Sequence, residues 1–207
     1  MAESKKKAVS RAPRLGADDW VRAGLVTLAR YGMANVRIER LARDLKVTKG
    51  SFYWHFKDRK ALLDAMLAEW RVYSNHIIEL AIEQHPEDAF EQLRTLMRAP
   101  QTANDTNEGS RIELALRLWA RRDKYVSAML RDLYRYRHKT MAKILTGCGV
   151  GDADLLGLTR ILAATMTVLW ITDGLGEAER DSLINQMIDI VKRYAAAQPV
   201  KSQSARD

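Results

Sequence analysis

Residues 48–55 combine small, polar and aromatic side chains in an order that suits contact with DNA. Gly50 lets the backbone approach a duplex closely, and the ammonium group of Lys49 can donate hydrogen bonds to guanine. Hydroxyl and ammonium groups position a protein on phosphates, whereas only side chains deep in a groove read the base sequence. A helix over this segment would be shaped to enter the major groove. Its exposed residues would be Thr48, Lys49, Gly50, Ser51, Trp54 and His55.

The residues before this segment match the spacing of a helix-turn-helix over about residues 37–56. With Ile38 as its first position, Ala42 falls where the two helices cross closely and only a small side chain fits. Phe52 then lies on the buried face of the second helix, and Val47 fills the turn between the helices. This spacing predicts that residues 48–55 project from a compact helical support.

The N-terminal part of the chain carries the positive charge. Residues 1–60 hold 15 basic and 6 acidic side chains, whereas the remaining residues hold 19 and 20. A near-neutral body with a strongly positive end suits a polyanionic partner, either nucleic acid or an anionic lipid surface. Residues 1–14 form a basic arm whose Arg11 and Arg14 could reach a minor groove.

The pattern of apolar residues predicts an all-α chain. No stretch alternates apolar and polar residues as a strand does, and no repeat of fixed period occurs. Residues 18–31 predict an amphipathic helix that ends at Gly32, and Asp58 is placed to cap a long helix reaching about residue 84. Further helices are expected after Pro86 to about residue 98 and over residues 110–121, 123–146, 152–174 and 179–196.

The helix over residues 152–174 carries two apolar faces, rotated by roughly 130° from each other at about 3.6 residues per turn. One face is enough to pack a helix on its own domain, so the second predicts a partner. The last helix offers a neighbouring apolar face, and two such helices from each of two chains would form a four-helix bundle. The predicted dimer interface comprises Ile161, Ala164, Val168, Ile171, Ile184, Met187, Ile188 and Val191.

Large aromatic and methionine side chains stand on otherwise apolar helix faces outside the DNA-binding segment. Such side chains are common core residues, but they also line cavities for hydrophobic or aromatic ligands because they offer broad contact with few polar demands. We expect Trp70, Tyr73 and Trp170 to matter most. The candidate pocket consists of Trp70, Tyr73, Met97, Trp119, Met166 and Trp170.

Residues 15–63 resemble the DNA-binding domain of the TetR-type transcriptional regulators. The resemblance depends above all on residues 47–59, with the sequence VTKGSFYWHFKDR. It covers about a quarter of the chain by motif, and beyond residue 63 only the helical layout and the length match. Before this run, the matching positions are Trp20, Val21, Ala23, Leu25, Leu28, Gly32, Ile38, Leu41 and Ala42.

The resemblance implies a role for individual residues and for the rest of the chain. Implied phosphate contacts are Thr48, Tyr53, His55 and Lys57, implied base-facing residues are Lys49, Gly50 and Trp54, and residues that would lie along the DNA backbone are Arg40 and Arg43. The resemblance also implies a C-terminal domain that dimerises and holds an effector among its helices. An effector would then act by shifting the helix over residues 58–84 and changing the separation of two recognition helices.

Two residues depart from the pattern of this family. Lys46 stands in the turn where the family usually has glycine, so a left-handed or compensating conformation is expected at a cost of roughly 1 kcal/mol. Arg37 stands where the family usually has a capping serine or threonine. Neither change removes an implied DNA contact, but both bear on the geometry of the turn.

No catalytic, metal or cofactor site is expected. The four histidines are scattered, and no serine, histidine and acid are spaced as a nucleophilic triad. The segment Gly147–Gly151 follows a helix and lacks a Lys-Ser/Thr pair, so it is interpreted as a flexible link and not as a phosphate loop. The single Cys148 fits a reducing compartment, and no apolar stretch is long enough to span a membrane. A cytoplasmic protein is expected.

These observations predict a homodimeric DNA-binding regulator with a palindromic operator. It would be a repressor released by a small hydrophobic or aromatic effector. The alternatives are a sequence-neutral, nucleoid-type or membrane-surface binder and, from a different class, a small helical enzyme. The expected divisions are a basic arm (1–14), the DNA-binding domain (15–62), an effector-binding and dimerisation domain (63–196) and a disordered tail (197–207).

Overall fold

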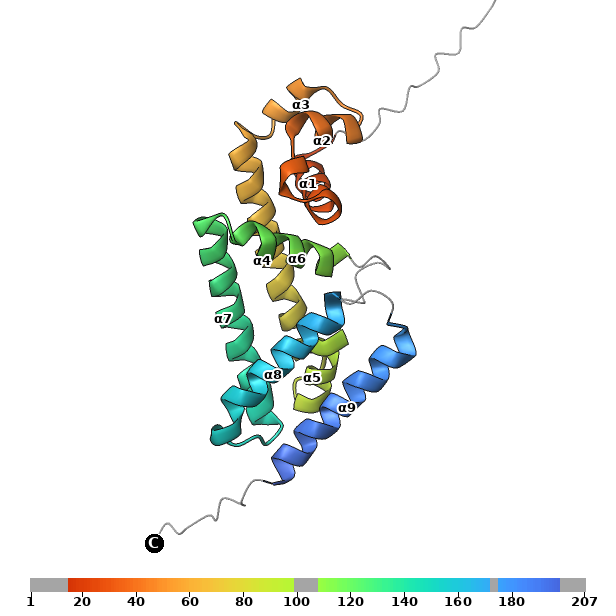
Figure 1. Ribbon diagram of the computed structural model, residues 1–207, viewed down its shortest axis with the longest axis vertical. Coiled ribbons are helices and arrows are strands. Elements are labelled where there is room, and N and C mark those ends of the chain that lie inside the picture. Colours follow the sequence, from red (N-terminus) through yellow and green to blue (C-terminus); the bar gives the residue numbers. More distant parts are fainter. Residues whose placement is uncertain (1–14, 99–107, 172–174, 198–207) are drawn as a thin grey trace, which may run out of the picture.

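The computed structural model describes residues 15–98, 108–171 and 175–197, and every regular element within these ranges is a helix. The molecule is elongated, and α1 (Ala17–Tyr31), α2 (Ile38–Asp44) and α3 (Lys49–Tyr53) form one end of it (Figure 1). A short 3₁₀ turn, η1 (Met33–Asn35), joins α1 to α2. From this end α4 (Arg59–Gln84) runs into the body of the molecule. The predicted all-α fold is confirmed.

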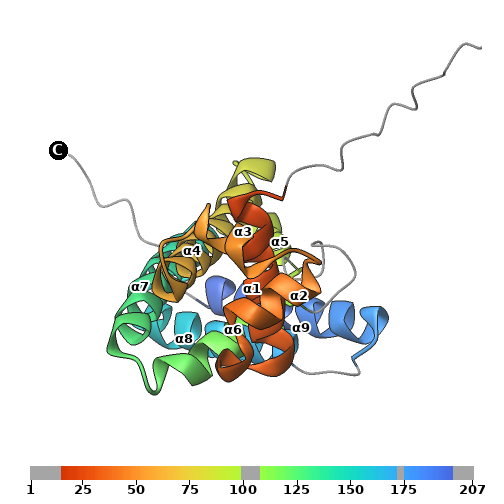
Figure 2. The same ribbon diagram turned by 90° about the horizontal axis from the view of Figure 1, so that it is seen from above.

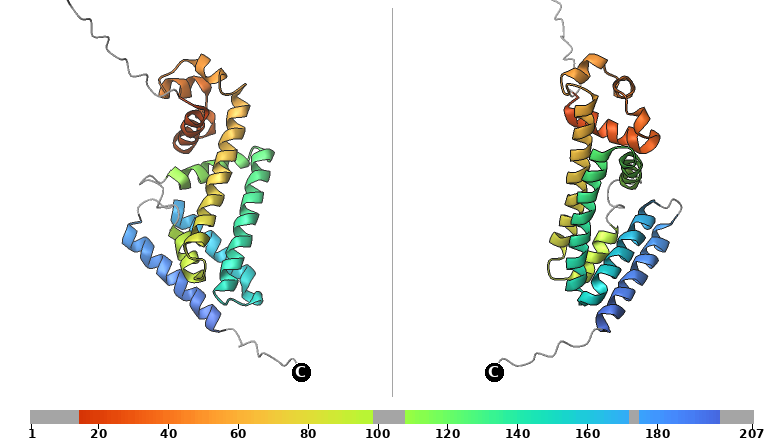
Figure 3. Two further views of the ribbon diagram at one scale, coloured as in Figure 1. Left: turned by 180° about the vertical axis from the view of Figure 1, so that it is seen from behind. Right: turned by 60° about the vertical axis from the view of Figure 1, so that its left-hand side comes forward.

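Five further helices complete the described part of the body. They are α5 (Ala89–Arg98), α6 (Glu108–Ala120), α7 (Lys124–Gly147), α8 (Asp152–Ile171) and α9 (Glu177–Ala196). α6 crosses the molecule directly beneath α1, and α7 runs beside α4 (Figures 1 and 3). No helix in the described ranges is long and apolar enough to cross a membrane.

Acidic N-caps set the starts of the two longest helices. Asp58 accepts a hydrogen bond from the amide of Ala61 at 2.8 Å and so caps α4 as predicted. At the start of α7, Asp123 accepts bonds from the amides of Tyr125 and Val126. Each carboxylate also lies near the positive end of the helix dipole.

The C-terminus of α7 is an ordered helix cap. Gly149 has a φ of 90°, and its amide donates to the carbonyl of Thr146 while the amide of Val150 donates to Leu145. This pair of bonds is the Schellman arrangement, which favours glycine at the left-handed position. Cys148 and Val150 are buried here, and burial raises the pKa of the Cys148 thiol to about 11. The expected flexible link at this point is wrong.

Two clusters of buried apolar side chains hold the molecule together. The first begins with Trp20 and Leu28 in α1 and continues through α4 and α6 into the first half of α7. The second joins the far ends of α4 and α7 to α5, α8 and α9. The first cluster therefore extends across residue 62, where the sequence predicts a boundary between two domains. That boundary stays a prediction. The end formed by α1, α2 and α3 and the upper body share one core.

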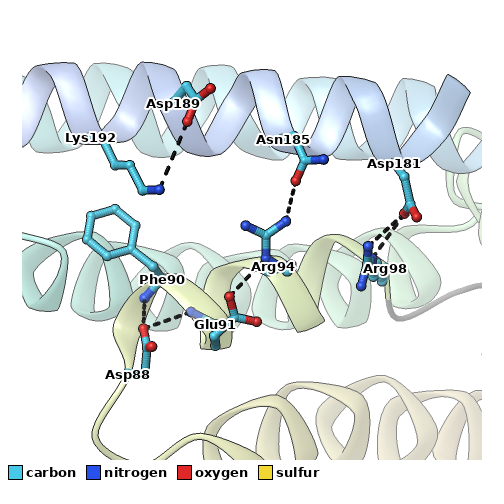
Figure 4. A network of polar contacts seen from close by, with 9 residues as sticks. All are labelled: Asp88, Phe90, Glu91, Arg94, Arg98, Asp181, Asn185, Asp189 and Lys192. Atoms are coloured by element: carbon cyan, nitrogen blue, oxygen red, sulfur yellow. Dashed lines mark hydrogen bonds and ion pairs between the residues drawn. The ribbon is translucent and has the colours of Figure 1, made fainter. Parts of the chain in front are cut away.

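One face of α9 is turned inward and packs on α5. Arg94 donates to Asn185, and Arg98 forms an ion pair with Asp181 at 3.0 Å (Figure 4). Lys192 lies over the ring of Phe90, 5.7 Å from its centroid. Between these polar contacts, three residues predicted for the dimer interface are almost completely inaccessible. They are Ile184, Ile188 and Val191.

The prediction of those three residues as interface is therefore wrong, because each serves the core of its own chain. The predicted face of α8 differs: Ile161 is 59% exposed, Val168 is 57% exposed, and Ala164 is exposed between them. Met187 on α9 is partly buried. The side chain of Ile171 lies outside the described residues.

Candidate nucleic-acid interface and ligand cavity

Helix α3 is held on the molecule by a single buried ring. Phe52 is fully buried and meets Trp20 of α1 edge to face, with 5.2 Å between ring centroids. Phe56 stacks on the same ring at 5.5 Å. Because aromatic contacts of this kind resist rotation of the short helix, Phe52 fixes which face of α3 points outward.

The turn before α3 has the left-handed conformation that is expected where lysine stands in place of the usual glycine. Lys46 has a φ of 58°, and within the described ranges no other non-glycine residue has a positive φ. Its amide donates to the carbonyl of Arg43, and the amide of Val47 donates to Ala42. The hydrogen bonds of a glycine-type C-cap are thus complete, and the strain of a left-handed lysine is the cost.

Arg37 and Thr48 both occupy N-cap positions without using their side chains as caps. The Nε of Arg37 instead donates to the carbonyl of Ala34 at 2.9 Å, which ties the start of α2 to η1. Thr48 is exposed, and its hydroxyl makes no capping hydrogen bond. The hydroxyl of Thr48 is therefore available to a partner outside the chain.

The side chains predicted to contact DNA gather at the free end of the molecule. Seen from above, α2 and α3 cover this end (Figure 2). Trp54 is 88% exposed, and Tyr53 is 53% exposed although it borders Phe52. Ser51 is partly buried, whereas the other candidates on and after α3 are exposed. These are Thr48, Lys49, Gly50, Tyr53, Trp54, His55 and Lys57.

Lys49 is paired within the chain. Its Nζ forms an ion pair with the carboxylate of Glu39 on α2. The hydrogen bond between them raises the pKa of Lys49 and lowers the pKa of Glu39, and both groups stay charged at neutral pH. The Lys49 ammonium is also the group predicted to contact bases, so its ion pair with Glu39 competes with that contact.

The two arginines of α2 differ in how firmly they are held. Arg40 donates to Asn35 at 3.1 Å, lies 3.5 Å from Asp44 and stacks over the ring of Tyr31. Arg43 is 76% exposed and has only a long contact to Asp44 at 3.9 Å. Arg43 is therefore the freer candidate for a phosphate contact, and Arg40 supports α2.

A cavity of about 380 Å³ lies in the body, lined by residues of α4, α5, α6, α7 and α8. Its apolar walls include Trp70, Ile77 and Ile78 of α4, with Met141 of α7 and Met166 of α8. This size falls within the range of small-molecule sites in proteins.

Three of the six predicted pocket residues line this cavity: Trp70, Tyr73 and Met166. Met97 is buried in the second apolar cluster, and Trp119 packs on the first, so neither lines this cavity. Helical periodicity places a side chain on an apolar face but does not say which part of that face stays unfilled. The side chain of Trp170 lies outside the described residues.

The cavity wall contains a charged network that the sequence pattern did not predict. Glu113 of α6 is buried and accepts hydrogen bonds from Arg137 of α7 at 2.9 and 3.0 Å. Arg117, one turn after Glu113, donates to Glu113 at 2.9 Å and to the hydroxyl of Tyr134 at 2.8 Å. Arg137 stands between Leu133 and Met141 at helical spacing, and a charged residue within a buried stripe was the available signal.

Electrostatics keep this network in a defined protonation state. Burial alone would raise the pKa of Glu113, but the pairing with Arg137 and Arg117 holds it below its usual value. Burial raises the pKa of Tyr134 to about 12, so its hydroxyl stays protonated. Burial also raises the pKa of Tyr73. The network around Glu113 therefore holds one carboxylate and two guanidinium groups, and the phenol of Tyr134 beside it is neutral at physiological pH.

The cavity and the DNA-binding end share two helices. On α4, Trp70 lines the cavity and also belongs to the apolar cluster around α1. On α6, Glu113 and Arg117 face the cavity while Ile112 and Leu116 pack into that same cluster. A shift of α4 or α6 would therefore change the packing of α1. Within the described ranges, no group of histidine, cysteine and acidic residues is arranged to hold a metal ion.

Comparison with known proteins supports the resemblance that the sequence of the N-terminal segment shows to the TetR-type regulators. The family model described as bacterial regulatory proteins of the tetR family matches residues 21–66. The class C tetracycline repressor of Escherichia coli is 45% identical over 56 residues. That match spans 27% of this chain and 25% of the repressor, so the chain matches about a quarter of this curated relative's length.

Similarity to solved structures extends over most of the chain. A transcriptional regulator from Rhodococcus sp. Rha1 has a TM-score of 0.72 at 14% identity, covering 89% of this chain and all of that one. A regulator from Saccharomonospora viridis, solved in complex with choline, has a TM-score of 0.69 at 20% identity and covers 84% and 95% of the two chains. These likenesses show the fold. The match over residues 21–66 identifies this N-terminal segment with the tetR family of bacterial regulatory proteins.

Proposed function

We propose that this protein is a homodimeric transcriptional regulator that binds a palindromic operator through α3 and leaves it when a small molecule enters the cavity. The observation that carries the proposal is the exposed surface of residues 48–57, held rigid by the buried ring of Phe52. A short helix braced in this way can enter a major groove without losing its shape. The positive charge of residues 1–60 adds phosphate attraction.

A second copy of the chain is the proposed partner of α8 and α9. These helices lie next to each other along one flank of the body (Figure 3). On α8 the exposed seam contains Ile161, Ala164 and Val168, and on α9 the outward positions Ile190 and Tyr194 are 38% and 43% exposed. Two helices from each copy would bury these apolar seams in a four-helix bundle.

Dimerisation supplies the geometry for operator binding. Two copies of α3 can occupy successive major grooves only if they lie about 34–36 Å apart. A ligand in the cavity touches α4 and α6, both of which share a core with α1. Repacking of either helix would change the separation of the two recognition helices and release the DNA.

Selection of bound duplexes from a random DNA pool tests this proposal. We expect recovery of a palindrome, bound far more tightly than its scrambled sequence at equal salt concentration. Binding that is equal for both sequences and varies only with salt would instead favour the nucleoid-type alternative. Light scattering of the same full-length protein should report a dimer, and a monomer that still binds the palindrome tightly would contradict the proposed geometry.

A further inference from the structure

We infer that the molecule recognised by the cavity is an amphipathic organic anion, a small carboxylate with an apolar body. The inference deepens the proposed function, because it names the chemical class of the effector. It replaces the purely hydrophobic or aromatic effector expected from the apolar residues alone. Three features of the wall support it: its charge, its hydrogen-bonding groups and its unpartnered polar atoms.

The charged side chains of the wall are not balanced. Three arginines and one glutamate line the cavity, which leaves two positive charges when His138 is neutral. Glu113 accepts hydrogen bonds from both Arg117 and Arg137, so one negative charge is divided between two guanidinium groups. Arg160 on α8 is exposed, so it lies where the cavity meets solvent, and it forms no ion pair with a described carboxylate. An anion would compensate this excess, whereas a cation would add to it.

The wall is also rich in hydrogen-bond donors. Within the described ranges, no group accepts from Nε or Nη2 of Arg137, or from Nη1 of Arg117. The hydroxyl of Tyr134 uses its oxygen to accept from Arg117, so its proton remains available. The carboxylate of Glu113 is the only anionic acceptor in the described wall, and both of its oxygens are engaged. A carboxylate offers the two acceptor oxygens that arginine matches best.

Two buried polar atoms of α4 point to a ligand independently of the charges. Ser74 is 2% exposed and Trp70 is 4% exposed, and both line the cavity. Among the described residues, neither the Ser74 hydroxyl nor the Trp70 indole nitrogen has a hydrogen-bond partner. Buried polar groups are normally paired, because an unpaired one destabilises the folded protein. A ligand oxygen that reaches either group would accept its hydrogen bond.

The remaining wall sets the shape of the ligand's body. Its apolar lining includes Ile77, Ile78, Leu96, Met141 and Met166, and a volume of about 380 Å³ accommodates one aryl or medium-length alkyl group. Apolar side chains of this kind contribute contact area without demanding hydrogen bonds. The complete ligand is therefore an anionic head on an apolar body.

A matched series of small molecules tests the inference on the full-length protein by calorimetry. The series is 4-phenylbutanoate, its amide 4-phenylbutanamide and the amine 4-phenylbutylammonium, with decanoate and choline as further probes. We expect at least one carboxylate to bind, and to bind about tenfold or more tightly than the amide, with no detectable binding of the amine or choline. Equal or tighter binding of the amide or a cation would overturn the inference. So would the failure of both carboxylates to bind at millimolar concentration.

Two variants locate the binding groups, each with a matched control. Arg160→Met removes an exposed charge at the cavity that has no ion-pair partner in the described ranges, and it should weaken carboxylate binding severalfold without changing thermal stability. Arg131→Met, on the exposed face of α7, should do neither. Ser74→Ala should weaken carboxylate binding, while Thr159→Val removes a buried unpartnered hydroxyl outside the cavity wall and should not. Unchanged carboxylate binding in both Arg160→Met and Ser74→Ala would overturn the assignment of the site.

Operator binding is measured on the same preparations without any small molecule, which separates the two proposals. If the protein binds its palindrome but prefers the amide or the amine, the inferred ligand class is wrong and the proposed function stands. If the protein binds carboxylates but no specific DNA, the inferred ligand class stands and the proposed function is wrong. The two failures are therefore distinguishable.

Discussion

Lys49 at the start of α3 forms an ion pair with Glu39 on α2. The pair spans the turn of the helix-turn-helix and holds the lysine against its own support. Both side chains are more than half exposed, so the pair is accessible to competition from DNA phosphates and bases. Removing the carboxylate therefore becomes a direct test of what Lys49 does.

Glu39→Gln should increase operator affinity a few-fold at low salt, because it frees the Lys49 ammonium and removes a negative charge near the DNA. Fluorescence anisotropy with the selected palindrome measures this. Asp64→Asn, which breaks the exposed Lys60 pair on α4, provides the control and should leave affinity nearly unchanged. A fall in affinity for Glu39→Gln would show that the pair orients Lys49 for binding.

Lys49→Ala and Lys57→Ala should weaken DNA binding in different ways. A base-reading lysine contributes to sequence preference, so Lys49→Ala should lower the ratio of operator to scrambled affinity. A phosphate-contacting lysine contributes equally to all sequences, so Lys57→Ala should weaken both and reduce the salt slope by about one. The same change in both variants would refute the separate roles.

Lys46→Gly should stabilise the protein by about 1 kcal/mol, since Lys46 holds a φ of 58° at a helix cap that glycine adopts without strain. Gly149→Ala is the mirror experiment at the equivalent position after α7, where φ is 90°, and should destabilise the protein by a similar amount. Urea unfolding measures both. If Lys46→Gly lowers stability, contacts of the lysine side chain outweigh the backbone strain.

Val168→Glu should produce a folded monomer with weak operator binding, because the charge would enter the apolar seam of the proposed dimer. Leu156→Glu is the control, since Leu156 is 63% exposed on α8 but lies off that seam. Light scattering and circular dichroism distinguish dissociation from unfolding. A Val168→Glu protein that remains dimeric would place the interface elsewhere.

Glu113→Gln should lower stability by about 3 kcal/mol at pH 7, because two guanidinium groups lose their buried carboxylate. The folded pKa of Glu113 is lower than the unfolded value of about 4.5, so its contribution is complete above that pH and declines as the pH falls through the folded pKa. The difference between wild type and variant should therefore shrink below about pH 4.5. A difference that is constant from pH 7 to pH 3 would contradict an ionised Glu113.

The local features of the DNA-binding end follow from sequence alone. Ala42, Val47 and Phe52 occupy positions whose size and polarity are dictated by contacts within about twenty residues, so their spacing predicts the motif. The left-handed Lys46 and the Asp58 cap are equally local, since each depends on the hydrogen bonds of a single turn. The helix boundaries follow from the same periodicity.

The cavity and the choice of exposed faces depend on how distant helices meet. Ile188 and Val168 both lie on apolar stripes, yet the packing of α9 on α5 buries the first and the packing of α8 leaves the second exposed. Glu113 and Arg137 lie 24 residues apart on different helices, and only the approach of α6 to α7 makes them a buried pair. Periodicity states which side of a helix is apolar, whereas burial and pairing require the neighbour that tertiary structure supplies.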